Sequence, residues 1–222
     1  MKREIIITSD GSTTIHLPNW NEQYHSKHGA IQEAYHVFIK AGLEQVNKDE
    51  VAVLEIGFGT GLNCFITFIE AEKSIKKIHY VGVEAYPISS DEISELNYVS
   101  ELKAVKHQNI FDKIHATSWG EKHQISNDFS LTKRKQFFKD IDDVNQFDLI
   151  YFDAFGARVQ PELWTEEIFA KMFIALKPNG VLTTYSAKGS VRRAMQSVGF
   201  IVERLQGPPG KREMLRATKV AK

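Results

Sequence analysis

The feature that most constrains this chain is an apolar run of strand length that leads directly into three glycines on alternate positions. Residues 51–56 are rich in β-branched side chains and predict a strand buried on both faces, and residues 62–70 return to helical spacing. Gly57, Gly59 and Gly61 therefore occupy a strand-to-helix turn. Because glycine tolerates positive φ angles and has no Cβ, this turn lets a ligand lie against the backbone and the helix N-terminus.

The spacing of these glycines distinguishes between nucleotide ligands. A dinucleotide fingerprint needs G-x-G-x-x-G, whereas this chain has G-x-G-x-G with Leu62 in place of the third glycine, which disfavours a pyrophosphate. Glu55, two residues before the first glycine, would repel a phosphate but accept hydrogen bonds from an ammonium group or a ribose. The pattern E-x-G-x-G-T-G resembles the first motif of class I S-adenosylmethionine-dependent methyltransferases. A glycine turn without a ligand is the alternative.

Length and composition set the domain count and the compartment that we expect. The chain has 222 residues, of which 42% are hydrophobic, so we expect residues 1–222 to form a single α/β domain. The single cysteine, Cys64, cannot form an internal disulfide, and Met1 to Ile7 lack the long apolar run of a signal peptide, which predicts a cytoplasmic location. No segment approaches the roughly 20 apolar residues that span a bilayer, so no membrane role is expected.

Strand and helix signals alternate along most of the chain. Runs rich in Ile and Thr predict an N-terminal hairpin, and a helical pattern follows it, so residues 1–48 form an extension before the first core strand. The expected strands are residues 4–8, 13–17, 77–83, 103–107, 147–152, 181–185, 200–205 and 213–217. The expected helices are residues 31–39, 88–98, 161–176 and 190–198.

Two segments depart from this alternation. Residues of about 115–140 predict an inserted β-hairpin, with strands at residues 115–119 and 129–138. Lys-Pro-Asn-Gly at residues 177–180 predicts a turn before the strand at residues 181–185.

Two carboxylates stand directly after predicted strands. Glu84 follows residues 77–83 and suits a ribose diol, and Asp153 follows residues 147–152 as a second chemical centre. In a doubly wound sheet the ligand lies outside the carboxyl ends of the strands, so both side chains should share one crevice with the glycine turn. An ordinary exposed carboxylate at Glu84, and a packing or capping role for Asp153, are the alternatives.

Charge is balanced overall, with 28 basic and 28 acidic residues, but residues 185–222 hold nine basic side chains against Glu203 and Glu213. This excess indicates either a solvated basic face or a patch that meets a polyanion. The histidines at positions 25, 28 and 36 lack a cysteine or carboxylate cluster of metal-ligand spacing, so no metal is expected.

Taken together, the motifs are similar to those of a methyltransferase family. The family that the motifs resemble is the methyltransferase domain of the bifunctional tRNA 5-methylaminomethyl-2-thiouridine biosynthesis protein, together with its stand-alone relatives. The matching pieces are Tyr24 to Gly29 with Glu33, Val37 and Phe38, then Glu55 to Asn63, Phe147 to Phe155, Pro161 to Trp164, Lys177 to Thr184, Val191 to Arg193, and Gly210 to Met214.

The resemblance implies a fold and a reaction. The fold is a class I methyltransferase, a Rossmann-like seven-stranded sheet with the N-terminal extension and the inserted hairpin. The reaction is transfer of a methyl group from S-adenosylmethionine to the exocyclic amine of 5-aminomethyl-2-thiouridine at the tRNA wobble position. The implied base is Asp153, which agrees with the need of a protonated alkylamine to lose a proton before it attacks. The implied cofactor residues are Glu55, Gly57, Gly59, Gly61, Asn63 and Glu84.

The implied partner is the anticodon loop of tRNA, whose substrate nucleoside a separate enzyme would supply. Aromatic side chains would hold the base and cations would meet phosphates. The candidates are Tyr24, Phe155, Lys188, Arg192, Arg193, Lys211 and Arg212.

The chain departs from the family pattern in two places. The family usually has an acidic residue near the adenine end of the cofactor, where ungapped comparison puts Gln136 and Phe137; Asp140 fits only with a shift and is left out of the site. The flavin-dependent oxidase domain of the bifunctional protein is missing, since the chain stops at Lys222, so no flavin chemistry is expected.

Two other classes of function remain open at this stage. A small-molecule amine methyltransferase or aminopropyl transferase would use the same glycine turn and an acidic amine site without needing the basic excess. A cofactor-binding protein without catalysis would keep residues 55–61 and transfer no methyl group.

Overall fold

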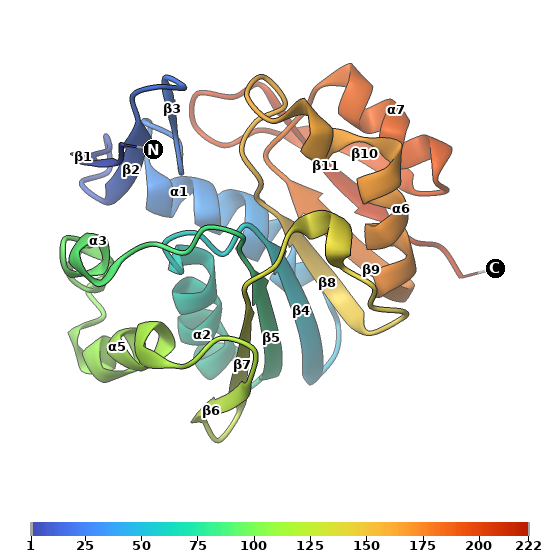
Figure 1. The fold of residues 1–222 in the computed structure, drawn as a ribbon. Helices are drawn as coiled ribbons and strands as arrows, with labels where there is room; N and C mark the ends of the chain where they lie inside the picture. Colours follow the sequence, from blue (N-terminus) through green and yellow to red (C-terminus); the bar gives the residue numbers. More distant parts are fainter. Residues whose placement is uncertain (1, 222) are drawn as a thin grey trace.

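The computed structural model describes residues 2–221, in which one eight-stranded sheet carries helices on both faces (Figure 1). The strands are β4 Glu50–Ile56, β5 Lys77–Val83, β6 Lys122–Ser126, β7 Phe129–Arg134, β8 Phe147–Phe152, β9 Leu176–Thr184, β10 Ile201–Gln206 and β11 Glu213–Thr218. Their order is β10-β11-β9-β8-β4-β5-β7-β6. The five strands from β9 to β7 in this order are parallel, and β6, β10 and β11 are antiparallel to their neighbours. The predicted doubly wound fold is confirmed, with β6 as an additional edge strand.

Helices and short turns connect these strands. The longer helices are α2 Leu62–Ser74, α5 Gln108–Ala116, α6 Glu166–Ala175 and α7 Gly189–Ser197. Shorter ones are α1 Ala30–Ala34, α3 Ser90–Ser94 and α4 Tyr98–Glu101, with 3-10 turns η2 Leu43–Gln45, η3 Val105–His107, η4 Phe138–Asp140 and η5 Pro161–Trp164. A π-helical turn, η1 Tyr35–Lys40, continues α1.

The N-terminal segment forms a separate small sheet. Strands β1 Glu4–Ile7, β2 Thr13–Leu17 and β3 Glu22–Gln23 pair antiparallel in that order, which confirms the predicted hairpin and extends it by one strand. The small sheet lies beside α1 at the upper left of Figure 1.

The core consists of two hydrophobic clusters on the two faces of the central sheet, and alternate residues of β4 feed each one. Val51 and Val53 pack in the cluster with the helices α1, η1, α2, α4 and α5. Leu54 and Ile56 pack in the cluster with α6 and α7. All four side chains have no exposed surface, so β4 is a fully buried central strand, as its run of apolar residues predicts.

The region between β5 and β8 differs from the prediction. The strand expected at residues 103–107 was wrong, because Lys103 takes a left-handed φ of 52° and η3 follows it into α5. Residues 115–119 close α5 and lead into the hairpin, which spans Lys122 to Arg134. Since β7 pairs in parallel with β5, this hairpin belongs to the central sheet and is not an insertion.

The turn expected at residues 177–180 is an irregularity inside β9. Between Phe147↔Leu176 and Leu149↔Val181, the pairing of β8 with β9 shifts register. Asn179, in this interval, has a φ of 63°. The Lys-Pro-Asn-Gly segment therefore interrupts the ladder without ending the strand.

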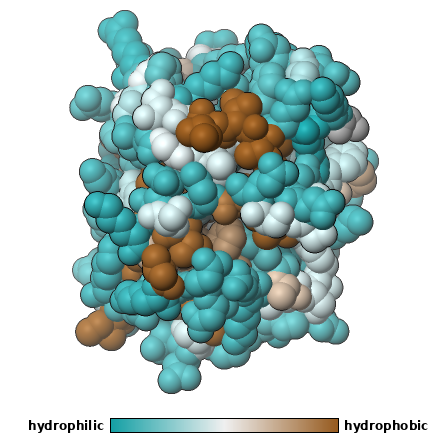
Figure 2. All heavy atoms as spheres, turned by 90° about the vertical axis from the view of Figure 1, so that its left-hand side faces the viewer, coloured by the Kyte–Doolittle hydropathy of each residue, from teal (hydrophilic) through white to brown (hydrophobic). Residues whose placement is uncertain are grey.

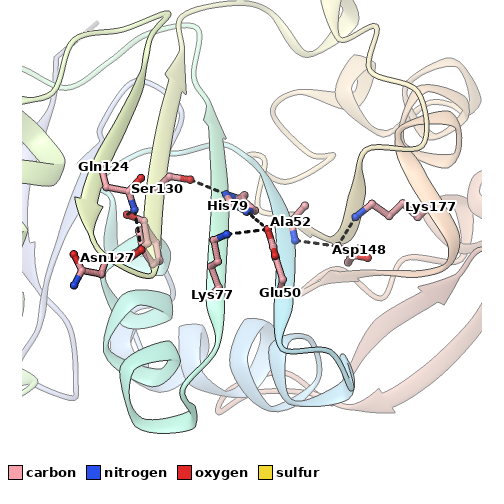
Figure 3. A network of polar contacts seen from close by, with 10 residues as sticks. Glu50, Ala52, Lys77, His79, Gln124, Asn127, Ser130, Asp148 and Lys177 are labelled. Carbon is pink, nitrogen blue, oxygen red and sulfur yellow. Dashed lines mark hydrogen bonds and ion pairs between the residues drawn. The ribbon is translucent and has the colours of Figure 1, made fainter.

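The amino-terminal edge of the sheet is tied together by ion pairs (Figure 3). Glu50 at the start of β4 accepts from Lys77 at 3.3 Å and lies 2.5 Å from the His79 imidazole on β5. Asp148 on β8 accepts from Lys177 at 2.7 Å and from the Ala52 amide at 2.9 Å. These contacts join β4, β5, β8 and β9 at the end opposite the glycine turn.

One face of the molecule is mostly hydrophilic (Figure 2). The face at the left of Figure 1 shows only separate hydrophobic patches among polar side chains (Figure 2). Among residues 2–221, no helix has both the length and the apolar character needed to cross a membrane.

Candidate active site

The glycine turn closes against the carboxyl ends of β5 and β8. The amides of Gly57 and Phe58 both donate to the Val83 carbonyl at 3.0 Å. Gly57 has a φ of 90°, and a Cβ there would lie 2.6 Å from the Asp153 carbonyl oxygen, so no other residue fits without displacing β8. The Gly59 amide donates to the Glu84 carboxylate at 3.1 Å. The turn and the two carboxylate-bearing strand ends therefore form one unit.

A cavity of about 1110 Å³ opens above this edge of the sheet. Gly57, Gly59, Asn63, Glu84 and Asp153 all line it, so the structure brings together most of the residues predicted from the sequence. The opposite wall combines apolar and charged side chains, Phe138 and Lys139 from η4 and Glu167 and Ile168 from α6. A cavity of this size, with a few convergent polar groups among apolar side chains, suits a nucleoside-sized ligand.

The N-terminal segment completes the wall of this cavity through Arg3, Trp20 and Tyr24. Arg3 donates to the Tyr86 carbonyl at 2.8 Å and pairs with Glu92 at 3.2 Å. The small N-terminal sheet is thereby held to the loop that follows β5, and this loop carries Glu84, which lines the cavity.

Asn63 joins two carboxylates. Its Nδ2 donates to Glu55 Oε1 and to Asp153 Oδ2, each at 2.9 Å, and Tyr80 donates to the other oxygen of Glu55 at 2.8 Å. Burial raises the pKa of Glu55 well above its usual range, although these hydrogen bonds oppose the rise. The Oδ1 of Asn63 is buried and has no partner within residues 2–221.

The structure gives no support to the predicted contact of Glu55 with a cofactor, because this side chain does not line the cavity. Glu55 is only 1% exposed and lies behind Asn63, outside the cavity lining, with both oxygens engaged. It orients Asn63 instead. Gly61 also lies outside the lining, and a Cβ there would meet the rings of His115 and Phe58 at 3.2 to 3.4 Å, so this glycine serves packing.

Asp153 has the most functionally suggestive environment in this cavity. Burial raises its pKa from 3.8 to about 7, and the nearby Glu33 carboxylate adds to the rise. The hydrogen bond from Asn63 and the charge of Lys211 act in the opposite direction. A carboxyl group that changes its protonation state near neutral pH is suited to proton transfer.

A second cavity of about 400 Å³ adjoins the first, and Tyr24, His25, Ala154 and Phe155 line both. The rings of Tyr24 and Phe155 meet edge to face with centroids 5.0 Å apart. The aromatic pair therefore stands between the two cavities, and Phe155 is one residue away from Ala154 and two from Asp153 along the chain.

The second cavity also contains two side chains that the site prediction omitted, Glu33 from α1 and Tyr185 from the loop after β9. Lys211 donates to Glu33 at 2.6 Å and lies 3.7 Å from the centre of the Tyr185 ring. Glu33 follows Ala30 and precedes Ala34 and Val37 on the buried side of its helix. A carboxylate on an apolar helix face was the available sequence signal for it.

Of the other predicted cations, Lys188, Arg193 and Arg212 are exposed, whereas Arg192 is partly buried and its Nε has no hydrogen-bond partner within the described residues. Lys188, Arg192, Arg193 and Arg212 come from α7 and the β10–β11 loop at the carboxyl edge, and in the described part of the chain none forms an ion pair. Arg204 and Arg216 pair with Glu213 and Glu203 across β10 and β11. The ammonium group of Lys211 is turned inward to Glu33 instead of outward, where a phosphate contact was expected. Lys222 lies outside the described residues.

The region expected near an adenine is aromatic. Phe137 and Phe138 line the first cavity, and Asp140 is an exposed residue at the end of η4.

Two of the three histidines considered for metal binding, His25 and His36, have protein partners for their rings. His25 lies 3.0 Å from the Thr14 hydroxyl and His36 lies 2.8 Å from the Gln206 carbonyl. In residues 2–221 no group of three or more His, Cys, Asp or Glu side chains is placed to hold a metal ion.

Comparison with known proteins defines the class. A family model described as S-adenosyl-L-methionine-dependent methyltransferase matches residues 100–220, more than half of the chain, and the chain belongs to this family. The fold agrees: a crystal structure of MNMC2 from Aquifex aeolicus matches with a TM-score of 0.75 and 22% identity over 100% of this chain and 72% of that one. Spermidine synthase from Thermotoga maritima matches with a TM-score of 0.58 and 14% identity over 100% and 73%.

Within the class, the chain is similar to curated proteins named tRNA 5-methylaminomethyl-2-thiouridine biosynthesis bifunctional protein MnmC. The protein from Cupriavidus metallidurans is 26% identical over 95% of this chain and 33% of its own length. The one from Burkholderia thailandensis is 28% identical over 95% and 34%. The chain thus spans about a third of the length of the curated relatives that it matches.

Proposed function

We propose that this methyltransferase acts on the exocyclic amine of 5-aminomethyl-2-thiouridine at the tRNA wobble position and produces 5-methylaminomethyl-2-thiouridine. The observation that carries the proposal is the place of Asp153, which lines the first cavity immediately before two residues that line both cavities. The names of the curated relatives support the choice of nucleoside.

The first cavity is the proposed cofactor site, and its residues fit the group. The glycine turn leaves the backbone open to a ligand, and Glu84 is held by the amides of Gly59 and Tyr86 with lone pairs left for ribose hydroxyls. The unpartnered Oδ1 of Asn63 suits a donor such as the ammonium group of a methionine tail. When bound, S-adenosylmethionine supplies an electrophilic methyl group on its sulfonium sulfur.

The second cavity is the proposed acceptor site. Tyr24 and Phe155 offer flat faces to a pyrimidine, and an unstacked anticodon base is a ligand that such a pocket can receive. The surface cations Lys188, Arg192, Arg193 and Arg212 would contact the phosphates of the loop.

Asp153 is the proposed base. An alkylammonium group entering from the second cavity would donate a hydrogen bond to this carboxylate and then transfer its proton to it, which exposes the nitrogen lone pair. Asn63 holds the carboxylate in place during the transfer. Alignment of the amine with the cofactor would supply much of the remaining rate.

The test is methylation of RNA with defined modification. The protein is incubated with labelled S-adenosylmethionine and with tRNA that carries the aminomethyl nucleoside, and the nucleosides are separated after digestion. We expect label in 5-methylaminomethyl-2-thiouridine and none in tRNA that already has it. Label on free amines instead of RNA would indicate the small-molecule alternative, and cofactor binding without any transfer would refute the proposal. A tRNA substrate would put the enzyme in the cytoplasm beside a separate enzyme that makes the aminomethyl group.

A further inference from the structure

We propose that Glu33 and Lys211 are a positioning pair that sets the protonation state of Asp153 and hence the pH at which the enzyme accepts an amine. This inference rests on the proposed function of Asp153 as the base. Neither residue contacts Asp153 through a hydrogen bond in the structure, so both act on it through charge and through Tyr185.

The pair is built into the wall of the second cavity. Glu33 has a side chain only 8% exposed; one oxygen accepts from the Ser26 amide at 2.8 Å and the other accepts from Lys211 at 2.6 Å. Hydrogen-bond donors of this kind offset the cost of burying a carboxylate. The position of Glu33 is therefore fixed by the loop before α1 on one side and by the β10–β11 loop on the other.

Lys211 is held equally firmly. Its amide donates to the Pro208 carbonyl at 2.9 Å, which closes the loop, and its ammonium group lies on the face of Tyr185. The hydroxyl of Tyr185 donates to the Ala154 carbonyl at 2.7 Å, one residue after Asp153. The Lys211 ammonium group thus contacts the Tyr185 ring, whose hydroxyl is hydrogen-bonded to the residue after Asp153.

The two charges of the pair have opposite effects on the pKa of Asp153. The Glu33 carboxylate raises the pKa of Asp153, and the Lys211 ammonium lowers it. The remaining groups that face Asp153 are Asn63 from α2, the buried Glu55 behind it on β4, and Tyr185 after β9. Glu22 faces Tyr185 from the N-terminal segment and pairs with the exposed Arg158 at 3.0 Å.

The expected result is a pair of opposite displacements. In Glu33→Gln the acid limb of the kcat/KM profile should move to lower pH, and in Lys211→Met it should move to higher pH. Since the limb reports the free enzyme's base, a displacement of about half a pH unit changes kcat/KM on the limb about threefold. The double variant should return toward the parent profile. Loss of activity by the same factor at every pH would show a merely structural role and overturn the proposal.

A matched control is the ion pair of Arg216 with Glu203 at 3.0 Å, which lines neither cavity. Glu203→Gln and Arg216→Met should leave the limb unmoved, and displacements equal to those of the Glu33 and Lys211 variants would refute a specific effect. If Glu33→Gln does not fold, Lys211→Met and Lys211→Arg decide the question, because the arginine variant keeps the charge and should keep the parent limb.

A second readout separates this proposal from the proposed function. The carboxyl carbons of 13C-labelled aspartates are titrated by NMR in the absence of substrate, and Asp153→Asn assigns the signal. The midpoint for Asp153 should fall in Glu33→Gln and rise in Lys211→Met even if the parent protein methylates no tRNA. Unchanged midpoints in both variants would overturn the pair's role, whereas absent methyl transfer alone would count against the proposed function.

Discussion

Replacing Asp153 with asparagine should reduce the rate of methyl transfer and at the same time increase the stability of the fold. Asparagine keeps the shape of the side chain, and its amide oxygen can still accept the bond that Asn63 donates at 2.9 Å. The variant loses only the charge and the ability to accept a proton. Methyl transfer should fall by about 10² to 10⁴, the usual contribution of a general base.

The gain in stability follows from the pKa of Asp153, which burial raises from 3.8 to about 7. The folded protein holds a proton that the unfolded chain releases, so this residue lowers stability progressively as pH rises from about 4 to about 7. The full difference corresponds to at most about 4 kcal/mol above neutral pH. Since asparagine cannot ionise, Asp153→Asn should be more stable by roughly 2 to 4 kcal/mol near pH 8 and almost unchanged near pH 4.

Thermal unfolding at the two pH values measures this directly. For a chain of this size each kcal/mol moves Tm by about 2 to 4 °C, so the variant should melt at least about 4 °C above the parent near pH 8. An equal gain at both pH values, or none at the higher one, would refute the assignment of a raised pKa. Single-turnover rates complete the assay: the defect should shrink as pH approaches the pKa of the substrate amine, and parent-like rates at neutral pH would remove Asp153 from the mechanism.

Three further variants test other parts of the molecule. Gly59→Val should abolish S-adenosylmethionine binding in calorimetry. Gly59 has a φ of 50°, and a Cβ there would lie 3.1 Å from the Tyr24 ring, which leaves no room for a branched side chain. Heat of binding from NAD but not from S-adenosylmethionine would contradict the cofactor assignment. Replacing Arg193 and Arg212 with alanine should weaken tRNA binding and reduce the salt slope by up to about two, with cofactor affinity unchanged, whereas an unaltered slope would return them to the solvated face. Asp148→Asn should destabilise the fold by roughly 1 to 3 kcal/mol in urea, since it weakens the charged hydrogen bonds from two partly exposed lysines. Although burial opposes it, the hydrogen bonds from Lys177, Lys48 and Ala52 hold the pKa of Asp148 below its usual range, so this loss should shrink as pH falls through that pKa, and a constant loss would argue against the ion pairs.

The parts of the site that a local pattern encodes could be predicted from the sequence. The glycine turn, Glu84 and Asp153 each follow an apolar strand directly, and parallel strands bring their carboxyl ends to one edge. The end of β8 was located to the residue for the same reason.

Contacts between distant segments could not be predicted in this way. Lys211 pairs with Glu33 of α1, 178 positions away in the chain. The basic residues next to Lys211 in the sequence indicated a phosphate contact, and no local pattern indicates Glu33 as its partner. Glu55 carries the motif's acid, but only the packing of Tyr80 and Asn63 around it reveals that it faces the interior. The strand expected at residues 103–107 failed because a left-handed Lys103 reverses the chain, and lysine gives no sequence signal for that conformation.

The hydrogen-bonded chain from Tyr80 through Glu55 and Asn63 to Asp153 gives the protein an internal optical reporter. Tyr80 is only 1% exposed, so its phenol chromophore is screened from solvent and responds mainly to the field of the groups that touch it. A change of charge at the cavity should therefore shift the ultraviolet band of a tyrosine in the core, and difference absorbance could follow the protonation state of Asp153 without any label.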